Sequence, residues 1–460
     1  MKERVKSVVL AVLVAFSLYQ SAALWSSGAP APVPHATEPV VFPGSTAEPQ
    51  GDPASPERIV WVDATGARSW TDPQDPAFAQ AWRALKATVA AVGPQALDGG
   101  GAAGGATALP ATPRLEAVWP DPLPWSVIYA AAAGHPWTRG DGPSTSRVTA
   151  ALAGGKAYLA VGNLDQEVVV ELPAAPAELT QAAAQLGAAG GEAVVPLSPP
   201  APWSTAGPVW VPAQPPVLGE LAVAPEPLPE GPELPRAFFA ETDAVRRIDE
   251  KGGGVIFTDG RSTLRRDPAG ALAYDEPAPG TGEITFSTAQ AVAEAARFVG
   301  AHGGWPGPSL IWQVTARYPA GSLLADNPLP SAIVVQFVPV VAGTPVAGPG
   351  GPLGVLVESG GPAGYRRLAR AILGPSAGSV RQIIAPAQAL AALDAAWPEI
   401  YPGGHSERRI ADMRVVYFSP NEIRGRQALR PAWSIRLADG DEWAVDAYDG
   451  RVLSTTMWKP

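Results

Sequence analysis

An apolar run opens the chain and follows three basic residues, Lys2, Arg4 and Lys6. The run covers residues 8–24, and as a helix it would span roughly 27 Å, close to the thickness of a bilayer hydrocarbon core. Basic residues before the run favour a cytoplasmic N-terminus. We therefore expect residues 1–25 to form a cytoplasmic tip and a single transmembrane helix, with the rest of the chain outside the cell membrane.

A cleaved signal peptide is the alternative for the same segment. Residues 8–18 would form its apolar region, and Ser21, Ala22 and Ala23 resemble a small-residue cleavage site. Both interpretations export the rest of the chain.

Small residues on the apolar run favour a retained anchor. Ser7, Ala11 and Ala15 recur every four residues, so they share one helix face that would let a partner helix approach closely. Ser17 and Gln20 add hydrogen-bonding groups near the outer end. The pattern predicts a partner-helix interface, although the general abundance of alanine explains it equally well.

Beyond a Pro/Ala-rich stalk at residues 26–56, the spacing of apolar residues predicts short elements. Helical spacing predicts a helix over 76–92 and a second over 177–187. Runs of apolar residues predict strands, and these are 58–62, 125–133, 147–152, 156–161 and 167–172.

The second half of the chain shows one pattern twice, a helix followed by an antiparallel meander. Ser287 and Gln290 form a capping-box sequence at the start of the first helix. Pro386 is placed where the first turn of the second helix tolerates proline.

These elements predict an α+β fold with antiparallel sheets in several extracytoplasmic domains. The expected boundaries are 57–240 for an N-terminal domain, 241–379 for a central domain and 380–460 for a C-terminal domain. The repeated helix-plus-meander pattern lies in the last two.

Composition narrows the classes of function. The 460 residues carry a net charge of −10, which argues against nucleic-acid binding because phosphate recognition needs a basic surface. The chain has no cysteine, so disulfides, thiolate metal sites and a cysteine nucleophile are excluded.

One motif suggests a hydrolase. Ser376 lies in a G-x-S-x-G sequence, His302 begins an HGG sequence upstream, and Asp394 and His405 follow. The context argues against a serine esterase, because residues 365–373 have the pattern of an arginine-rich helix rather than the buried strand that such a serine follows. We expect no catalytic residue here, and the esterase is a remote alternative.

Neither a metal site nor a cofactor site is predicted. The four histidines are scattered, with no pair three or four residues apart. Asp439, Asp441 and Glu442 lack the spacing of a calcium loop, as do Asp446 and Asp449, and acidic residues are common in hairpin turns.

Several segments together resemble the YycH family of membrane-anchored extracytoplasmic proteins. The similarity covers nearly the whole chain, but residues 57–240 match only in layout. The segments that carry it are Glu3–Trp25, Phe238-Phe239, Thr258–Arg265, Tyr274–Pro277, Arg297–Trp305, Val335–Phe337, Pro345-Val346 and the meander from Pro431 to Gly450, which is similar to PepSY-like units of YycH and YycI.

The resemblance implies regulation rather than catalysis. Its members associate with a YycI-like sibling and with the WalK sensor histidine kinase of a two-component system that controls cell-wall homeostasis, and their transmembrane helices take part. It also implies that the N-terminal anchor is retained. A module that binds a cell-wall fragment or a peptide is the alternative function.

Overall fold

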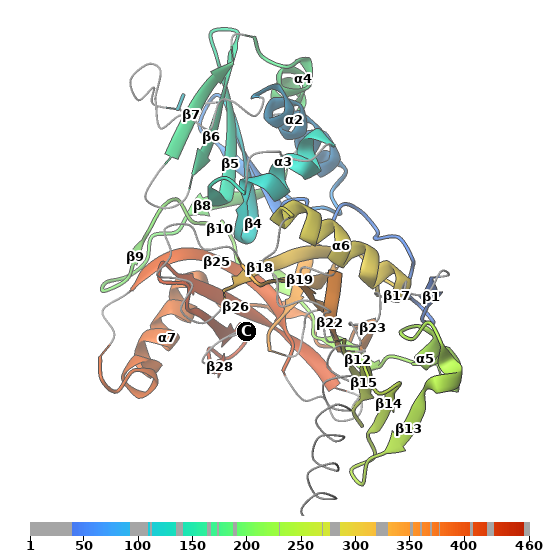
Figure 1. The fold of residues 1–460 in the computed structure, drawn as a ribbon. Coiled ribbons are helices and arrows are strands. Elements are labelled where there is room, and N and C mark those ends of the chain that lie inside the picture. The colour runs from blue at the N-terminus through green and yellow to red at the C-terminus, as the bar shows by residue number, and fades with distance from the viewer. Residues whose placement is uncertain are drawn as a thin grey trace, which may run out of the picture.

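The computed structural model contains two large, mostly antiparallel sheets that lie one above the other (Figure 1). The structure describes residues 39–454 apart from these gaps: 93–108, 111–112, 135–140, 163–166, 173, 187–190, 230, 269, 277–285, 319–329, 350–352, 359–360, 369, 377, 405–407 and 421–426.

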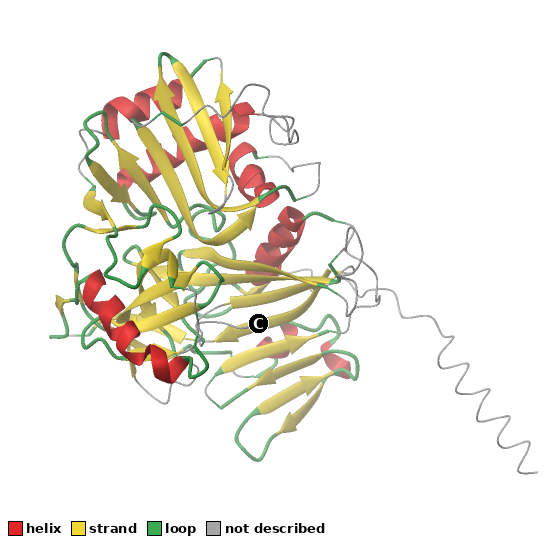
Figure 2. Cartoon of the chain, turned by 90° about the vertical axis from the view of Figure 1, so that its left-hand side faces the viewer, coloured by secondary structure: helices red, strands yellow, loops and turns green. Residues whose placement is uncertain are grey.

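The upper sheet has eight strands in the order β10-β8-β3-β2-β4-β5-β6-β7, and helices cover one of its faces (Figures 1 and 2). Its strands are β2 (Arg58–Val62), β3 (Arg68–Thr71), β4 (Arg114–Pro124), β5 (Ser144–Ala153), β6 (Lys156–Gly162), β7 (Glu167–Leu172), β8 (Glu192–Pro196) and β10 (Trp210–Pro212). The helices are α2 (Pro76–Val92), α3 (Trp125–Ala133) and α4 (Ala177–Leu186).

The lower sheet has sixteen strands and runs from the edge strand β13 to the C-terminal meander. Its strands are β9 (Ser204–Thr205), β12 (Leu221–Pro225), β13 (Arg246–Asp249), β14 (Val255–Thr258), β15 (Thr263–Arg266), β16 (Ala271–Asp275), β18 (Ser309–Arg317), β19 (Ala332–Val341), β20 (Thr344–Ala347), β21 (Leu353–Glu358), β22 (Gly361–Leu368), β23 (Arg370–Pro375), β25 (Arg409–Phe418), β26 (Gln427–Leu437), β27 (Glu442–Asp446) and β28 (Val452–Ser454).

Smaller elements complete the described fold. Two short pairs of strands lie beside the large sheets, β1 with β17 and β11 with β24. The remaining elements are β1 (Val40–Val41), β11 (Val217–Leu218), β17 (His302–Gly303), β24 (Arg381–Gln382), α5 (Glu233–Arg236), the 3-10 helix Thr242–Ala244, α6 (Thr288–Ala301) and α7 (Pro386–Ile400).

One hydrophobic core extends through both sheets. It joins Ile59 and Leu85 of the upper part to Phe298, Val335 and Tyr365 of the lower part, all of them buried. Helix α6 lies between the two parts: it contacts β19, β21 and β22 of the lower sheet on one side and α3 of the upper part on the other.

Local sequence signals explain several boundaries. Helix α2 has the predicted bounds, and α6 begins with the predicted capping box: the Ser287 hydroxyl accepts from Gln290 N, and the Gln290 side-chain oxygen accepts from Ser287 N. Pro386 occupies the first turn of α7, as predicted.

The predicted α+β class is wrong, because strands make up 45% of the structure and helices 21%. Strands of the expected central and C-terminal domains join one sheet instead of forming two small ones. Strand β20 pairs in parallel with β25, and β12 pairs with both β23 and β26. These long-range pairings supply hydrogen-bond partners for backbone groups that each meander alone would leave unpaired at its edges.

The transmembrane helix in that fold prediction gains no support. No helix in the described part of the chain is long and apolar enough to cross a membrane. Residues 8–24, on which the prediction rests, lie outside the described residues.

Two local predictions are also wrong. Residues 125–133 form helix α3 rather than a strand, because the alanines at 130–133 favour a helix and Gly134 ends it in a left-handed conformation. Residues 365–368 and 370–373 fall in strands β22 and β23 rather than in a helix. There Tyr365 and Arg367 are buried while Arg366 is exposed, which is the alternation of a strand.

Candidate interaction site

Three of the segments behind the family resemblance, Phe238-Phe239, Tyr274–Pro277 and Arg297–Trp305, meet in one aromatic cluster at the end of α6. Phe298 stacks on His302 with ring centroids 3.7 Å apart, and Phe238 lies 5.5 Å from His302 and 5.2 Å from Tyr274. Phe298 and His302 are one helical turn apart, so α6 directs both rings to the same side. Trp305 packs edge-on against Phe337 at 5.0 Å. Segments up to about 100 residues apart in sequence therefore form one packed unit.

The stretch from His302 to Trp305 holds an N-terminal arm, residues 40–48. Strand β1 pairs in parallel with β17, and Phe42 N donates to Gly303 O at 3.0 Å. Farther along, Thr46 and Trp305 exchange two backbone hydrogen bonds of 2.9 and 2.7 Å. The arm is thus bound as a short extra strand across the end of α6.

Gly303 is required for this arrangement. Its φ is +105°, and a Cβ atom there would lie 2.6 Å from the Phe42 ring. The Phe42 ring is almost completely buried against this glycine. The HGG sequence, considered above as part of a hydrolase-like motif, instead holds the arm.

A buried ion pair closes the arm site from below. Arg367 pairs with Glu226 and also donates to Ser45 of the arm and to Gly304 O. Burial disfavours its charged form, but Tyr365 and Glu226 outweigh burial and hold the pKa of Arg367 above its usual value. The guanidinium also lies 5.1 Å from the centroid of the Phe42 ring, a cation–π contact.

A cleft of about 260 Å³ opens beside this cluster. It is lined by the loop after α5 and by the β14–β15 turn, and Phe239, Arg261, Ser262, Tyr274 and Glu276 contribute side chains. Tyr274 donates to Glu276 at 2.9 Å, and burial followed by the charge of Glu276 raises the pKa of this phenol. The cleft offers hydroxyl, carboxylate and guanidinium groups beside aromatic rings.

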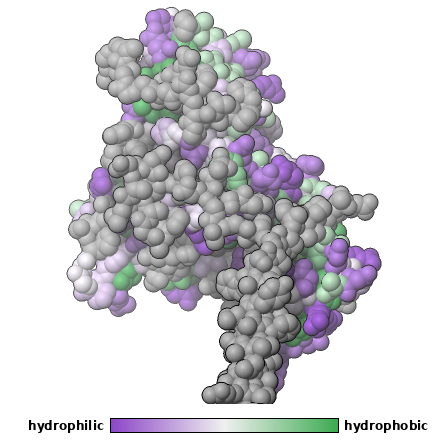
Figure 3. All heavy atoms as spheres, viewed as in Figure 1, coloured by the Kyte–Doolittle hydropathy of each residue, from purple (hydrophilic) through white to green (hydrophobic). Residues whose placement is uncertain are grey.

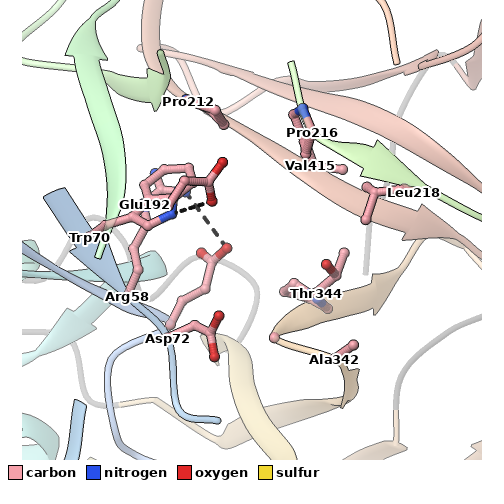
Figure 4. A pocket seen from close by; sticks show the side chains of 13 residues that line it. Arg58, Trp70, Asp72, Glu192, Pro212, Pro216, Leu218, Ala342, Thr344 and Val415 are labelled. Atoms are coloured by element: carbon pink, nitrogen blue, oxygen red, sulfur yellow. Dashed lines mark hydrogen bonds and ion pairs between the residues drawn. The ribbon is translucent and has the colours of Figure 1, made fainter. Parts of the chain in front are cut away.

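A second cleft of about 170 Å³ lies between the two sheets (Figure 4). Trp70, Asp72 and Glu192 line one side, while Leu218 and Val415 line the other. Trp70 Nε1 donates to Glu192 at 2.8 Å. Partial burial, and then the charge of Asp72, raise the pKa of Glu192.

Buried charges join the two sheets behind this second cleft. Arg414 of β25 contacts Glu57 at 2.6 Å and also pairs with Asp412, and Arg58 of β2 contacts Asp412 at 2.7 Å. Arg414 further donates to the carbonyl of Pro120 at 2.8 Å. Two buried arginines and two buried carboxylates therefore neutralise one another at the junction between the sheets.

The residues of the considered esterase have separate partners. Ser376 N donates to Glu220 O, Asp394 pairs with Arg408, and buried His302 stacks on Phe298. His405 lies outside the described residues. The predicted partner-helix residues also lie outside the described residues, and they are Ser7, Ala11, Ala15, Ser17 and Gln20.

The acidic residues near the C-terminus serve hairpin turns. Asp446 accepts from the backbone N–H of Tyr448 and Asp449, and Asp439 accepts from that of Asp441. Within the described ranges, no three histidine or acidic side chains converge as metal ligands would.

Sequence reasoning missed Phe42, Glu226 and Arg367. Phe42 lies in the predicted stalk, where Val40 and Val41 precede it and Pro43, Gly44 and Ser45 follow it, too short an apolar stretch to show a period. An alternating interpretation of 365–368 would have placed Arg367 inside and indicated that a buried carboxylate must face it.

Comparisons with known proteins give no family assignment. No family model matches the chain, and no curated protein does. Among solved structures, the chain is similar to an uncharacterized protein from Eubacterium rectale ATCC 33656, with a TM-score of 0.37 and 10% sequence identity. The match covers 52% of this chain and 86% of that one.

Proposed function

We propose that the protein is a membrane-associated extracytoplasmic regulator that binds a WalK-like sensor histidine kinase and shifts it between two states by contact alone. A YycI-like sibling is the proposed second partner, and the cell membrane is the proposed location. Such a regulator must have unequal affinity for the two kinase states.

The observation that carries this proposal is the convergence of three of the family-like segments. Phe238, Tyr274, Phe298 and His302 lie in one cluster, and the cleft of about 260 Å³ opens beside them. Segments that are distant in sequence but share one role are expected to lie close together in space.

The arm supplies a physical route for regulation. Residues 40–48 are bound to His302–Trp305 by backbone hydrogen bonds and by the buried Phe42 ring. Residues 40–48 are therefore fixed to the core, so a contact that reorients the core also reorients the arm.

The test uses the full chain reconstituted in vesicles with the kinase. We expect the kinase to co-purify with the wild-type protein and its autophosphorylation rate to change at least twofold. Phe42→Ala should weaken that change, because it removes the ring that fixes the arm.

Phe78→Ala is the matched control. Phe78 is a buried phenylalanine on α2 in the upper part, outside the arm site. Both substitutions should cost about 3–5 kcal/mol of stability. An effect of equal size from both variants would assign the loss to stability. Failure of the wild-type protein to retain the kinase would contradict the proposal itself.

The two clefts favour a second candidate function, the capture of a peptide. Their volumes of about 170 and 260 Å³ are smaller than the roughly 300–1,000 Å³ of sites for drug-sized ligands, so each suits one side chain. Saturable binding of cell-wall peptides by the full chain, lost in Tyr274→Ala, would favour this function over kinase contact.

A further inference from the structure

We propose that β13 is a self-complementary edge through which two copies of this chain pair in antiparallel fashion into one continuous sheet. This proposal is independent of the kinase. Strand β13 ends the lower sheet and pairs, among the described residues, with β14 alone. Figures 1 and 2 place the meander that it ends at the outer end of the molecule. The surface over it is mostly hydrophilic (lower right in Figure 3), yet Ile248 at its centre is 50% exposed.

The backbone of β13 has groups free for such pairing. Glu250 N donates to Gly254 O at 2.8 Å, so the residue after the strand directs its N–H toward β14. Groups alternate along an antiparallel strand, which places Arg246 and Ile248 in the same orientation as Glu250. The N–H and C=O of Arg247 and Asp249 therefore face outward. An antiparallel second copy in the right register would form four backbone hydrogen bonds with them.

The side chains select one register. With a two-fold axis through Ile248, Arg247 lies opposite Asp249 of the second copy, and Asp249 lies opposite the second Arg247. On the other face Arg246 lies opposite Glu250, and the two Ile248 side chains meet at the axis. Every charged residue of the edge then faces an opposite charge, and the exposed isoleucine is covered.

Charged residues on an edge strand ordinarily prevent pairing. Here they do not, because the strand is basic at one end and acidic at the other. Two antiparallel copies therefore place opposite charges beside each other. Strand β7, another exposed edge, is the contrast: its charged residues are Glu167 and Glu171, so no register of two copies supplies opposite charges. Two copies of β7 would therefore repel each other, whereas two copies of β13 carry complementary charges.

Existing ion pairs do not oppose this arrangement. Arg247 contacts Asp249 of its own strand at 2.9 Å, and Arg265 contacts Glu250 at 3.1 Å. The Arg247 and Asp249 side chains are 58% and 69% exposed, so their pair contributes little and can change partners. Because the strand has only four residues, we expect a weak dimer that depends on concentration and salt.

Sedimentation velocity of the purified full-length chain in mild detergent tests the pairing by charge exchange. We expect a reversible monomer–dimer equilibrium for the wild-type protein. Arg247→Asp and Asp249→Arg should each weaken dimerisation about tenfold, since two attractive cross-strand pairs become repulsive. The double variant R247D/D249R restores opposite charges and should restore the dimer. Glu167→Arg on β7 is the control and should leave the equilibrium unchanged.

Crosslinking tests the register. The chain has no cysteine, so Ile248→Cys introduces a single thiol at the proposed axis. The Cα atoms of directly opposite residues lie about 4.5 Å apart in such a pair, within the range for a disulfide. We expect Ile248→Cys to form a dimer rapidly under mild oxidation and Arg246→Cys, which is displaced from the axis, to do so slowly.

Three outcomes would overturn the proposal. One is a wild-type chain that stays monomeric at all concentrations, together with slow crosslinking of Ile248→Cys. Another is a dimer that the charge exchanges leave unchanged. The third is a cysteine at position 248 that crosslinks in cells to a different protein rather than to a second copy, which would assign the edge to that partner.

Discussion

Asp412 is the residue on which the junction between the sheets depends. It is almost completely buried and contacts Arg58 from the upper sheet and Arg414 from its own strand. Burial alone would raise its pKa, but the two guanidinium groups outweigh burial and hold the pKa of Asp412 below its usual value. The carboxylate is therefore charged in the folded protein, and both arginines need it.

Asp412→Asn should lower the free energy of unfolding by about 3–5 kcal/mol, because it leaves buried positive charge uncompensated. The measurement is urea unfolding at pH 7. Asp275→Asn is the matched control: Asp275 pairs with Arg366 at the surface, where its side chain is 60% exposed, so the cost should stay within about 1 kcal/mol. Equal losses in the two variants would contradict the role given to the junction.

The same carboxylate predicts a pH dependence. A folded-state pKa below the ordinary value of 3.8 means that the stabilisation is fully present above about pH 4 and is lost as the pH falls toward the folded-state pKa. Wild-type protein should lose stability faster than Asp412→Asn as the pH falls below 4. Unfolding curves with parallel pH dependence in both proteins would show that other groups control the acid limit.

At the scale of elements, the two helices of the lower part differ in how they begin. Ser287 caps α6 with its side chain, whereas Ala385 at the same position of α7 has no side-chain acceptor. The other half of the capping arrangement is present in α7, since Ala385 N donates to Gln388 at 2.8 Å. The extended backbone of Ala385 already suits a capping residue.

Ala385→Ser should therefore raise the free energy of unfolding by about 1 kcal/mol by completing the capping box. The reverse change at the equivalent site, Ser287→Ala, should lower it by a similar amount. Both are measured by urea unfolding with unchanged m-values. A destabilising Ala385→Ser would mean that the serine side chain cannot reach the N–H of Gln388.

Elements with strong local signals could be predicted from the sequence. The bounds of α2 and the start of α6 follow from apolar spacing and from a cap, which act over a few residues. Residues 125–133 and 365–373 could not be assigned in this way. Their state depends on what each face meets, and for Arg367 that is Glu226, 141 residues away.

The arm site shows the same limit for function. The sequence pointed to His302–Trp305, but its use depends on Phe42, some 260 residues earlier in the chain, and no periodicity marks Phe42. The aromatic cluster was likewise visible only as separate segments. Contacts between residues distant in sequence decide what such a motif does.

At the scale of the whole molecule, segments of the expected domains interlock. Residues 203–211 belong to the expected N-terminal domain, yet Trp203, Val209 and Val211 lie in the C-terminal core with Leu390 and Trp433. The Trp203 ring packs edge-on against Trp397 of α7 at 5.1 Å. The C-terminal core is therefore completed by residues from the first half of the chain.

This interlocking predicts that residues 380–460 do not fold alone, although the sequence suggests a separate domain there. Without Trp203 and its neighbours, the buried faces of Trp397 and Leu393 would be exposed to water, at a cost of about 1.5–3 kcal/mol for each fully exposed side chain. A unit of this size has only a few kcal/mol of stability to lose. The measurement is the amide dispersion of the isolated fragment by NMR. We expect poorly dispersed amide resonances for residues 380–460 and well-dispersed resonances for a fragment that begins at residue 197 and runs to residue 460. A well-dispersed spectrum of the shorter fragment would show that the C-terminal core folds alone and that residues 203–211 only cover it.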